Sequence, residues 1–379
     1  MATPVRWPEE GHVRPSHWCV AVLVVAGVGI STVMHGQLEP AANLSPMVNP
    51  GPGKNAQDPA SARIREELRL GGNYLGGSGV PRDPVRAAYW YRKAADDGDP
   101  SGQNELGYLY VWGIGVPKDT GQAVRWFARA AGGGWQPAKL NMAVMYMHGT
   151  GVARDPQFAR QLLEDLAARK NARAEDYLGL MYLDGNGVAQ DTSVAEEWFS
   201  RSAKGKNPEG EYAMGQLYSE AAGHAHDFAR AAKFLRESAR AGFVPAMYTL
   251  GVLLMTHAEV EQKPGEAVAL LERAAEGGTW QSAAMLGLMA RDGRGMRQDM
   301  GEAFRWLTIA AKQGGTAAEV KTRVNLAQCR AALTPAEQEE ETQAAERWLG
   351  QHPHADLFLF SNARTDLPVG EVSAMRASE

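Results

Sequence analysis

Two short clusters in this chain have the side-chain types that could hold a metal ion. His224, His226 and Asp227 stand within four residues of one another, and His352 and His354 form a weaker pair. A structural zinc site takes four ligands, and a catalytic one takes three plus a water. Two histidines with one carboxylate in a single loop are a weak match to that requirement. We therefore predict no metal site and no cofactor.

Candidate nucleophiles are equally sparse. The chain has two cysteines, Cys19 within an apolar segment and Cys329 in a stretch shared with Leu326 and Leu333. This pair cannot provide a disulfide framework, and Cys329 is expected to be a buried, unreactive thiol. The sequence contains no Walker-type phosphate loop, no H-E-x-x-H and no paired C-x-x-C, and no serine or cysteine has a nucleophile motif. We predict no catalytic residue and no enzymatic activity.

Acidic residues recur at fixed spacing, which would suit either acid–base chemistry or helix capping. Two of these aspartates are followed by proline, at Pro84 and Pro156. Aspartate at the N-cap followed by proline at the first helical position is typical of a helix start. We interpret the whole set as N-caps: Asp83, Asp119, Asp155, Asp191, Asp227 and Asp299.

The helices that follow these caps repeat every 36 residues. One alanine column keeps that step without exception: Ala87, Ala123, Ala159, Ala195, Ala231, Ala267 and Ala303. Three residues later stands a bulky column: Trp90, Trp126, Leu162, Trp198, Phe234, Leu270 and Trp306. Positions i, i+3, i+4 and i+8 form one face of an α-helix, so the tryptophans are predicted to be core residues and not a ligand platform.

The first helix of each unit has its own small column, which is mostly glycine: Gly71, Gly107, Ala143, Gly179, Gly215, Gly251 and Gly287. Glycine within a helix costs about 1 kcal/mol relative to alanine. The recurrence therefore indicates close packing against the second helix of the same or the neighbouring unit. A G-x-G-V turn joins the helices, as at residues 113–116 and 149–152, and its first glycine suits a left-handed helix end.

These columns resemble the Sel-one-like repeat, a longer relative of the tetratricopeptide repeat. Residues 102–134 and 174–205 match its pattern closely, and the resemblance covers residues 62–315. It implies an all-α, right-handed superhelical solenoid of about seven 36-residue helix–turn–helix repeats at residues 61–316. It also implies an adaptor that holds other proteins, in bacteria often at the cell envelope. Disulfide-rich relatives have been linked to weak β-lactam hydrolysis, but their paired cysteines are missing here.

The pattern degrades in places. In repeat five, residues 221–224 do not match the expected G-x-G-V turn. In repeat six, residues 257–260 do not match it either, and Lys263 replaces the capping aspartate. Drift in tolerant loops explains this more simply than a partner site. Beyond repeat seven we predict two C-terminal capping helices with a polar outer face at residues 317–351, the second starting at Thr334. A flexible tail at residues 352–379 carries the apolar run 357–360, which could dock on the cap or on a partner.

The N-terminal part is of a different kind. Residues 18–34 are apolar without a charge, Arg6 and Arg14 precede them, and no Lys or Arg follows until Lys54. We predict a cytoplasmic segment at 1–17, a single-pass inner-membrane anchor at 18–34 and a Pro/Gly-rich linker at 35–60. The repeats would then lie on the periplasmic side. The alternative is a cleaved signal and a periplasmic protein.

The charge balance narrows the choice of partners. The formal net charge is −5 over 379 residues, without the basic excess that nucleic-acid binders usually carry. We therefore expect protein or peptide partners, held on the concave surface of a membrane-anchored scaffold. Tyr108 and Trp112 break their columns and are the candidate partner-binding residues. An envelope regulator or accessory factor for polysaccharide export or secretion is the alternative, and a weak hydrolase is a further one.

Overall fold

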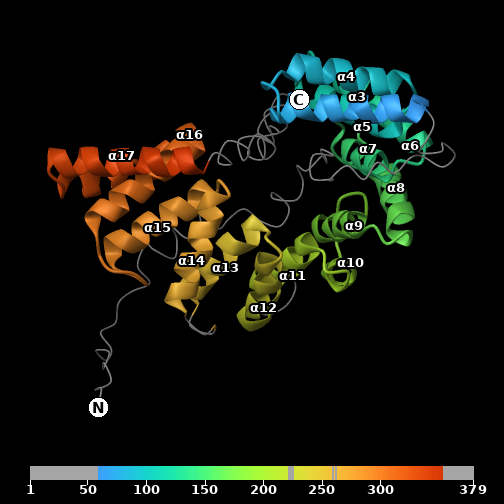
Figure 1. Cartoon of the computed structure of the whole chain (residues 1–379). Helices are drawn as coiled ribbons and strands as arrows, with labels where there is room; N and C mark the ends of the chain where they lie inside the picture. Colours follow the sequence, from blue (N-terminus) through green and yellow to red (C-terminus); the bar gives the residue numbers. More distant parts are fainter. Residues whose placement is uncertain (1–58, 221–225, 258–259, 261–262, 353–379) are drawn as a thin grey trace, which may run out of the picture. The chain divides into compact units, whose positions relative to one another are not determined.

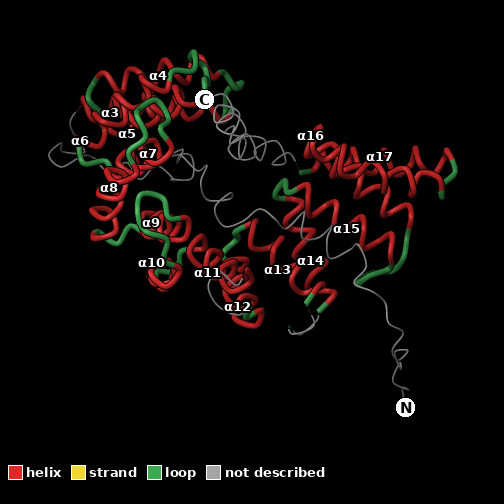
Figure 2. Tube along the Cα trace, turned by 180° about the vertical axis from the view of Figure 1, so that it is seen from behind, coloured by secondary structure: helices red, strands yellow, loops and turns green. Residues whose placement is uncertain are grey.

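The computed structural model describes residues 59–220, 226–257, 260 and 263–352 (Figures 1 and 2). The predictions for the membrane segment 18–34, most of the linker, the repeat-five turn at 221–224 and the tail from 353 onward lie outside these residues. All regular structure in the described part is α-helical. None of its helices is both long and apolar enough to cross a membrane.

The chain divides into two compact units, and the division falls between His226 and Asp227, next to the altered turn of repeat five. The N-terminal unit contains these helices: α3 (Pro59–Gly76), α4 (Pro84–Asp96), α5 (Pro100–Trp112), α6 (Thr120–Gly132), α7 (Gln136–His148), α8 (Pro156–Ala168), α9 (Ala172–Asp184), α10 (Thr192–Lys204) and α11 (Pro208–Glu220). The C-terminal unit contains the others: α12 (Phe228–Arg240), α13 (Val244–Thr256), α14 (Pro264–Glu276), α15 (Trp280–Asp292), α16 (Met300–Ala331) and α17 (Pro335–Gln351).

The predicted 36-residue step is confirmed in the helix boundaries. First helices begin at Pro100, Gln136 and Ala172, and second helices begin at Pro84, Thr120 and Pro156, each 36 residues after the one before. Within each unit, consecutive helices pack against each other, as α3, α4 and α5 do in Figure 1. Within each unit the described helices thus form a solenoid, in which each repeat contacts its neighbours in sequence.

The aspartates act as caps, as predicted. Each of the six accepts a hydrogen bond from a backbone N–H in the first turn of the helix that follows, at 2.8 to 3.1 Å. Such a cap stabilises a helix by about 1 kcal/mol. Lys263 precedes α14 and makes no side-chain cap, in keeping with its departure from the pattern.

The glycine column is explained by close packing within each repeat. A Cβ atom built on Gly107 would lie 2.8 Å from the Phe127 ring, and one on Gly179 would lie 2.5 Å from the Phe199 ring. Both rings belong to the second helix of the same repeat, which is one of the two predicted contacts. The first glycine of the turn, Gly113, ends α5 in the left-handed region with φ 69°, which residues with a Cβ rarely adopt.

The C-terminal end continues the helical stack beyond repeat seven. Helix α16 is broken at Gly315, which has φ 55° and ψ −147°, so its second half, residues 316–331, runs in a new direction. This half begins 36 residues after α15, and α17 begins 35 residues after α16. The two predicted helices are therefore an eighth, degenerate repeat. The predicted capping box at its second helix is confirmed, with Thr334 and Glu337 hydrogen-bonded reciprocally.

Candidate interaction surface

The predicted binding residue Tyr108 lies between two repeats and not on an open surface. Its side chain is 4% exposed, and Val144 and Leu180, which occupy the same column in repeats three and four, are also buried. Asn104 lies one turn earlier on α5 and accepts a hydrogen bond from Asn141 of α7 at 3.1 Å. This side of each first helix is therefore covered by the next first helix. Tyr108 therefore departs from its column at an inter-repeat contact and not at an exposed surface, and partner binding by Tyr108 stays a prediction.

Trp112 lies one turn further along α5 and is half-buried. Its ring is tilted at 53° against that of Tyr108, with the ring centroids 6.3 Å apart. The indole N–H is buried and has no hydrogen-bond acceptor among the described residues. A buried donor without an acceptor costs roughly 1–3 kcal/mol. Trp112 therefore combines an accessible ring edge with an unsatisfied donor, which fits the predicted role, although binding itself stays a prediction.

Sequence reasoning missed a set of polar contacts between consecutive first helices of the N-terminal unit, which we call the polar seam. It consists of three contacts: Asn141 with Asn104 at 3.1 Å, Asn207 with Asp176 at 2.5 Å, and the bidentate pair of Arg173 with Glu209 at 2.7 and 2.8 Å. The signal for it was the pair Asn104 and Asp176, which are polar residues in a column that is otherwise apolar. Buried polar groups are costly unless paired, so these contacts favour the observed neighbours at two junctions, between α5 and α7 and between α9 and α11.

Asp176 is the most constrained charge of the seam. It is almost fully buried, and its Oδ1 atom is buried without a hydrogen-bond partner. Burial raises the pKa of the Asp176 carboxyl well above its usual range, and a hydrogen bond from Ser202 opposes this only in part. The seam therefore contains a carboxyl that favours its neutral form.

The tryptophan column is core only in part, because Trp126, Leu270 and Trp306 are buried and its other members are half-buried. Two of its tryptophans also carry a cation over the ring, which the sequence alone did not indicate. The Arg129 guanidinium lies 4.5 Å from the Trp126 ring centroid, and that of Arg201 lies 4.2 Å from the Trp198 centroid. Spacing of three residues on one helix places each cation over its ring.

The other chemistry-bearing residues were also located. Asp227 caps α12, and His224 and His354 lie outside the described residues, so the two histidine clusters are not seen whole. No group of three possible metal ligands occurs within the described ranges. Cys329 packs with Leu326 and Leu333 as predicted, and burial raises the pKa of its thiol, which disfavours the reactive thiolate.

The two terminal helices of the stack differ in what they present. On α3, Glu66 and Arg69 form a bidentate ion pair at 2.6 and 2.8 Å, in columns that hold packed residues in later repeats. On the second half of α16, Val320 and Val324 are 60% and 63% exposed. The predicted polar outer face is thus found on α17, where Glu339, Glu340 and Glu346 are exposed, whereas the second half of α16 exposes both valines and charges such as Lys321 and Arg323.

Antiparallel helix pairs, a fixed 36-residue step and neighbour-only packing define a class of protein, the α-helical repeat scaffolds that bind other proteins. The chain belongs to the Sel1 repeat family. The family model matches seven consecutive segments: residues 67–99, 100–135, 136–171, 172–207, 208–243, 244–279 and 280–315. The resemblance inferred from the sequence is thereby confirmed, and with it the general role of a protein-interaction scaffold.

Several solved structures are similar to this chain. A Sel1 repeat protein from Oxalobacter formigenes is 28% identical over 58% of this chain and 88% of its own, with a TM-score of 0.50. A protective antigen of uropathogenic Escherichia coli with an SLR fold is 25% identical over 79% of this chain and 73% of its own, with a TM-score of 0.40. An immunity protein from Pseudomonas aeruginosa is 19% identical over 58% of this chain and 82% of its own, with a TM-score of 0.42. Among curated proteins no match is found.

Proposed function

We propose that this protein is a membrane-anchored adaptor that holds a protein partner along the row of first helices, with Trp112 as a contact residue. The observation that carries the proposal is the row itself, in which consecutive first helices of the N-terminal unit pack against one another through the polar seam. Such a row forms a long, pre-organised surface, which suits the binding of extended or folded protein segments.

Trp112 supports the placement of the partner on this row. Its half-buried ring lies at the C-terminal end of α5, and its indole N–H lacks an acceptor in the described part of the chain. Tryptophans of this kind are enriched among residues that dominate binding energy, because one ring provides a large apolar area and one hydrogen bond. A partner carbonyl that reached this donor after a small ring rotation would satisfy it.

The partner proposal is tested by crosslinking and affinity capture of the full chain in its own membrane. The partner should be enriched over a control that carries only residues 1–60. Trp112→Ala should reduce its recovery at least about tenfold, since a central tryptophan is often worth 2 kcal/mol or more. Tyr89→Ala is the matched control, because Tyr89 is an exposed aromatic on a second helix of the same unit. Equal loss in both variants would rule out the first-helix surface.

Anchoring through residues 18–34 rests on their uninterrupted apolar sequence and on the two preceding arginines. A phosphatase fused to the C-terminus should be active only if the repeats lie outside the cytoplasm. Extraction with alkaline carbonate then separates an uncleaved anchor, which stays in the membrane, from a cleaved signal, which releases the repeats. An active cytoplasm-only reporter at the same position would reverse the proposed orientation.

A further inference from the structure

An exposed apolar stripe runs along the second half of α16. Ala317, Val320, Val324, Ala327 and Ala331 are all exposed, and they are spaced three, four, three and four residues apart. This spacing places them on one side of the helix, opposite the side that is buried through Ala318, Thr322 and Cys329. We call these five residues the terminal stripe.

Two residues of the terminal stripe, Val320 and Val324, stand in columns that are buried in several other repeats. Val320 stands in the column of Leu140, Asp176 and Tyr212, and these three are at most 2% exposed. Val324 stands in the column of Tyr108, Leu180 and Val252. In those repeats the next first helix covers the column, as the hydrogen bond of Asn141 to Asn104 shows. The second half of α16 is the last of the first helices. It therefore exposes the side that a following repeat would cover, and no described helix lies on that side.

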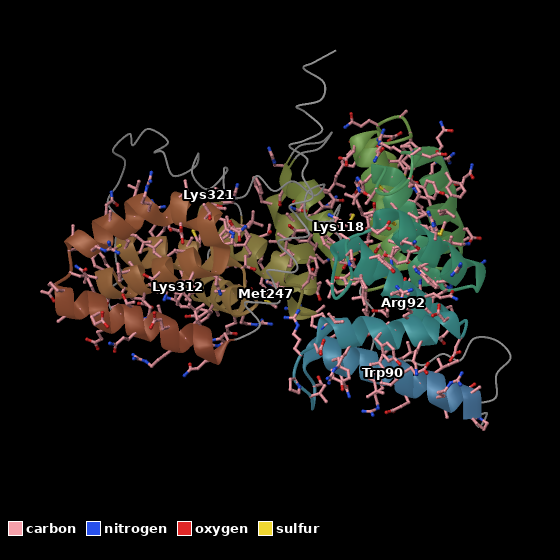
Figure 3. The ribbon with its side chains drawn as sticks, turned by 90° about the horizontal axis from the view of Figure 1, so that it is seen from above. Trp90, Arg92, Lys118, Met247, Lys312 and Lys321 are labelled. Atoms are coloured by element: carbon pink, nitrogen blue, oxygen red, sulfur yellow. The ribbon has the colours of Figure 1, made fainter. Side chains whose placement is uncertain are left out.

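Charges beside the terminal stripe limit what can cover it. Lys321 lies along one edge of the terminal stripe, and Arg323 and Arg330 lie along the opposite edge. Figure 3 labels Lys321 on this part of α16, together with Lys312, which forms an ion pair with Glu346 of α17 at 2.7 Å. Antiparallel pairing of two copies of this helix would bring Arg323 and Arg330 of one copy against those of the other. An acidic, apolar segment fits better than a second copy.

The chain leaves α17 close to this surface. α17 folds back from the second half of α16 after a turn of three residues, so its last residues lie beside the start of that half. His352 lies 3.9 Å from Glu276, at the end of α14. Trp280 follows Glu276 by four residues, and the Lys321 ammonium lies over its ring, 5.4 Å from the ring centroid. The exit of the chain is thus on the side of α16 where Lys321 borders the terminal stripe.

The residues that follow have the required chemistry. Asp356 precedes the apolar run Leu357, Phe358, Leu359 and Phe360. Five residues beyond His352 span up to ~17 Å when extended, which is enough to reach the terminal stripe. Pro353 stands in the column of Pro137 and Pro245, which lie in the first turns of α7 and α13. The segment therefore emerges at the position in the 36-residue step at which a further first helix would begin.

We propose that residues 355–360 dock on the terminal stripe, with Asp356 beside Lys321 or Arg323, and thereby close the C-terminal end of the stack. The contact is intramolecular, so its effective concentration is in the millimolar range and a small apolar contact suffices. Aligned by helix start, Glu346 of α17 stands in a column that holds alanine in repeats two to seven, as at Ala311, which disfavours a full ninth repeat. The segment thus contacts α16 and not α17.

Hydrogen exchange of the full chain in mild detergent tests this contact. Backbone amides of residues 355–360 should exchange about tenfold more slowly in the wild type than in Val320→Glu/Val324→Glu. Val85→Glu/Tyr89→Glu is the matched control, because these two residues of α4 have the same spacing and similar exposure, at 66% and 54%. This control should leave the protection of the tail unchanged.

A second variant keeps the test independent of the folding of the stack. Phe358→Ser/Phe360→Ser changes only the tail beyond α17, and it should remove the same protection. Asp356→Lys should weaken it. Equal exchange of residues 355–360 in the wild type and in the stripe variant would overturn the proposal. So would a dimer in light scattering that the stripe variant dissociates, because a second copy would then be the occupant.

Discussion

The two ends of the stack place different residues at equivalent columns. At the N-terminal end, the columns that would face a preceding repeat hold the ion pair of Glu66 and Arg69. At the C-terminal end, the columns that would face a following repeat hold Val320 and Val324. Terminal repeats need a polar outer face to remain soluble. Helix α3 meets that requirement with its own side chains. The second half of α16, the last of the first helices, instead needs another segment to cover Val320 and Val324.

The difference shows two ways to end a stack of repeats. Polar residues can replace the apolar ones in the outer columns, or a further segment of the chain can cover the apolar ones. Substitution leaves the first repeat complete without further contacts. The apolar C-terminal end depends instead on what lies beyond α17. The expected changes below concern the two ends and the interior column that links them, from the largest effect on stability to the smallest.

Equivalent core truncations at the two ends should have equally large effects. Tyr91 and Leu307 occupy the same second-helix column and pack on Gly71 and Gly287 of their own repeats. Tyr91→Ala and Leu307→Ala should each lower the free energy of unfolding by roughly 3–5 kcal/mol. Because repeats contact only their neighbours, hydrogen exchange should increase mainly at the substituted end. Val85→Ala, at an exposed site, is the control, and uniform acceleration along the chain would contradict local coupling.

Trp348 holds the last helix of the C-terminal end. Its ring meets that of Trp306 edge to face, with the centroids 5.5 Å apart. Trp348→Ala should destabilise α17 by roughly 2 kcal/mol, through lost area and lost ring geometry. Trp348→Phe should retain most of that stability. Denaturant unfolding followed by Trp fluorescence or by exchange of α17 measures both, and equal behaviour of the two variants would count against the ring contact.

The column of Val320 also contains Asp176, so the interior can be compared with the end. The folded-state pKa of Asp176 is raised above its unfolded value by burial. The contribution of this carboxyl to the free energy of unfolding is therefore fully present at a pH below its pKa in the unfolded chain. That contribution is lost as the pH rises through its pKa in the folded protein. Asp176→Asn should therefore gain stability relative to the wild type as the pH rises, with a larger difference at pH 8 than at pH 4. A gain that does not change with pH would exclude titration as the cause.

Making the N-terminal end resemble the C-terminal end should have the smallest effect on folding. Glu66→Leu/Arg69→Leu removes an exposed ion pair, which contributes little to stability. The variant should unfold at nearly the wild-type midpoint but self-associate, because it exposes apolar columns without a segment to cover them. Sedimentation velocity over a range of concentrations detects this. Glu66→Gln/Arg69→Gln should remain monomeric, and association of both variants would point to lost charge instead of gained apolar surface.

Periodicity predicted most of the fold. The alanine, tryptophan and glycine columns located the helices, and the aspartates located their starts, because packing and capping depend on residue type at fixed spacing. The break at Gly315 was not predicted, although its φ of 55° is typical of glycine. Residues 316–331 share few column residues with earlier repeats, and the step was visible only once the helix boundaries were known.

The site was less predictable for a physical reason. A residue that departs from its column can be free to bind a partner, or it can be matched to one particular neighbour. Tyr108 and Asn104 are of the second kind, because the next first helix covers them. The sequence of a single repeat does not distinguish these cases. Only the pairing of Asn104 with Asn141, 37 residues away, does so.

The polar seam also makes the order of the repeats specific. Repeats that share one backbone would be interchangeable if their contacts were entirely apolar. Removing residues 136–171 would keep the 36-residue step, yet it would place Asn104 opposite Tyr177 in place of Asn141. An unpaired amide would then be buried at the new junction. Each seam contact can be made only by the two repeats that carry its side chains. Duplication or excision of a whole repeat that separates them would therefore give less stable junctions, even when the reading frame and the fold are preserved.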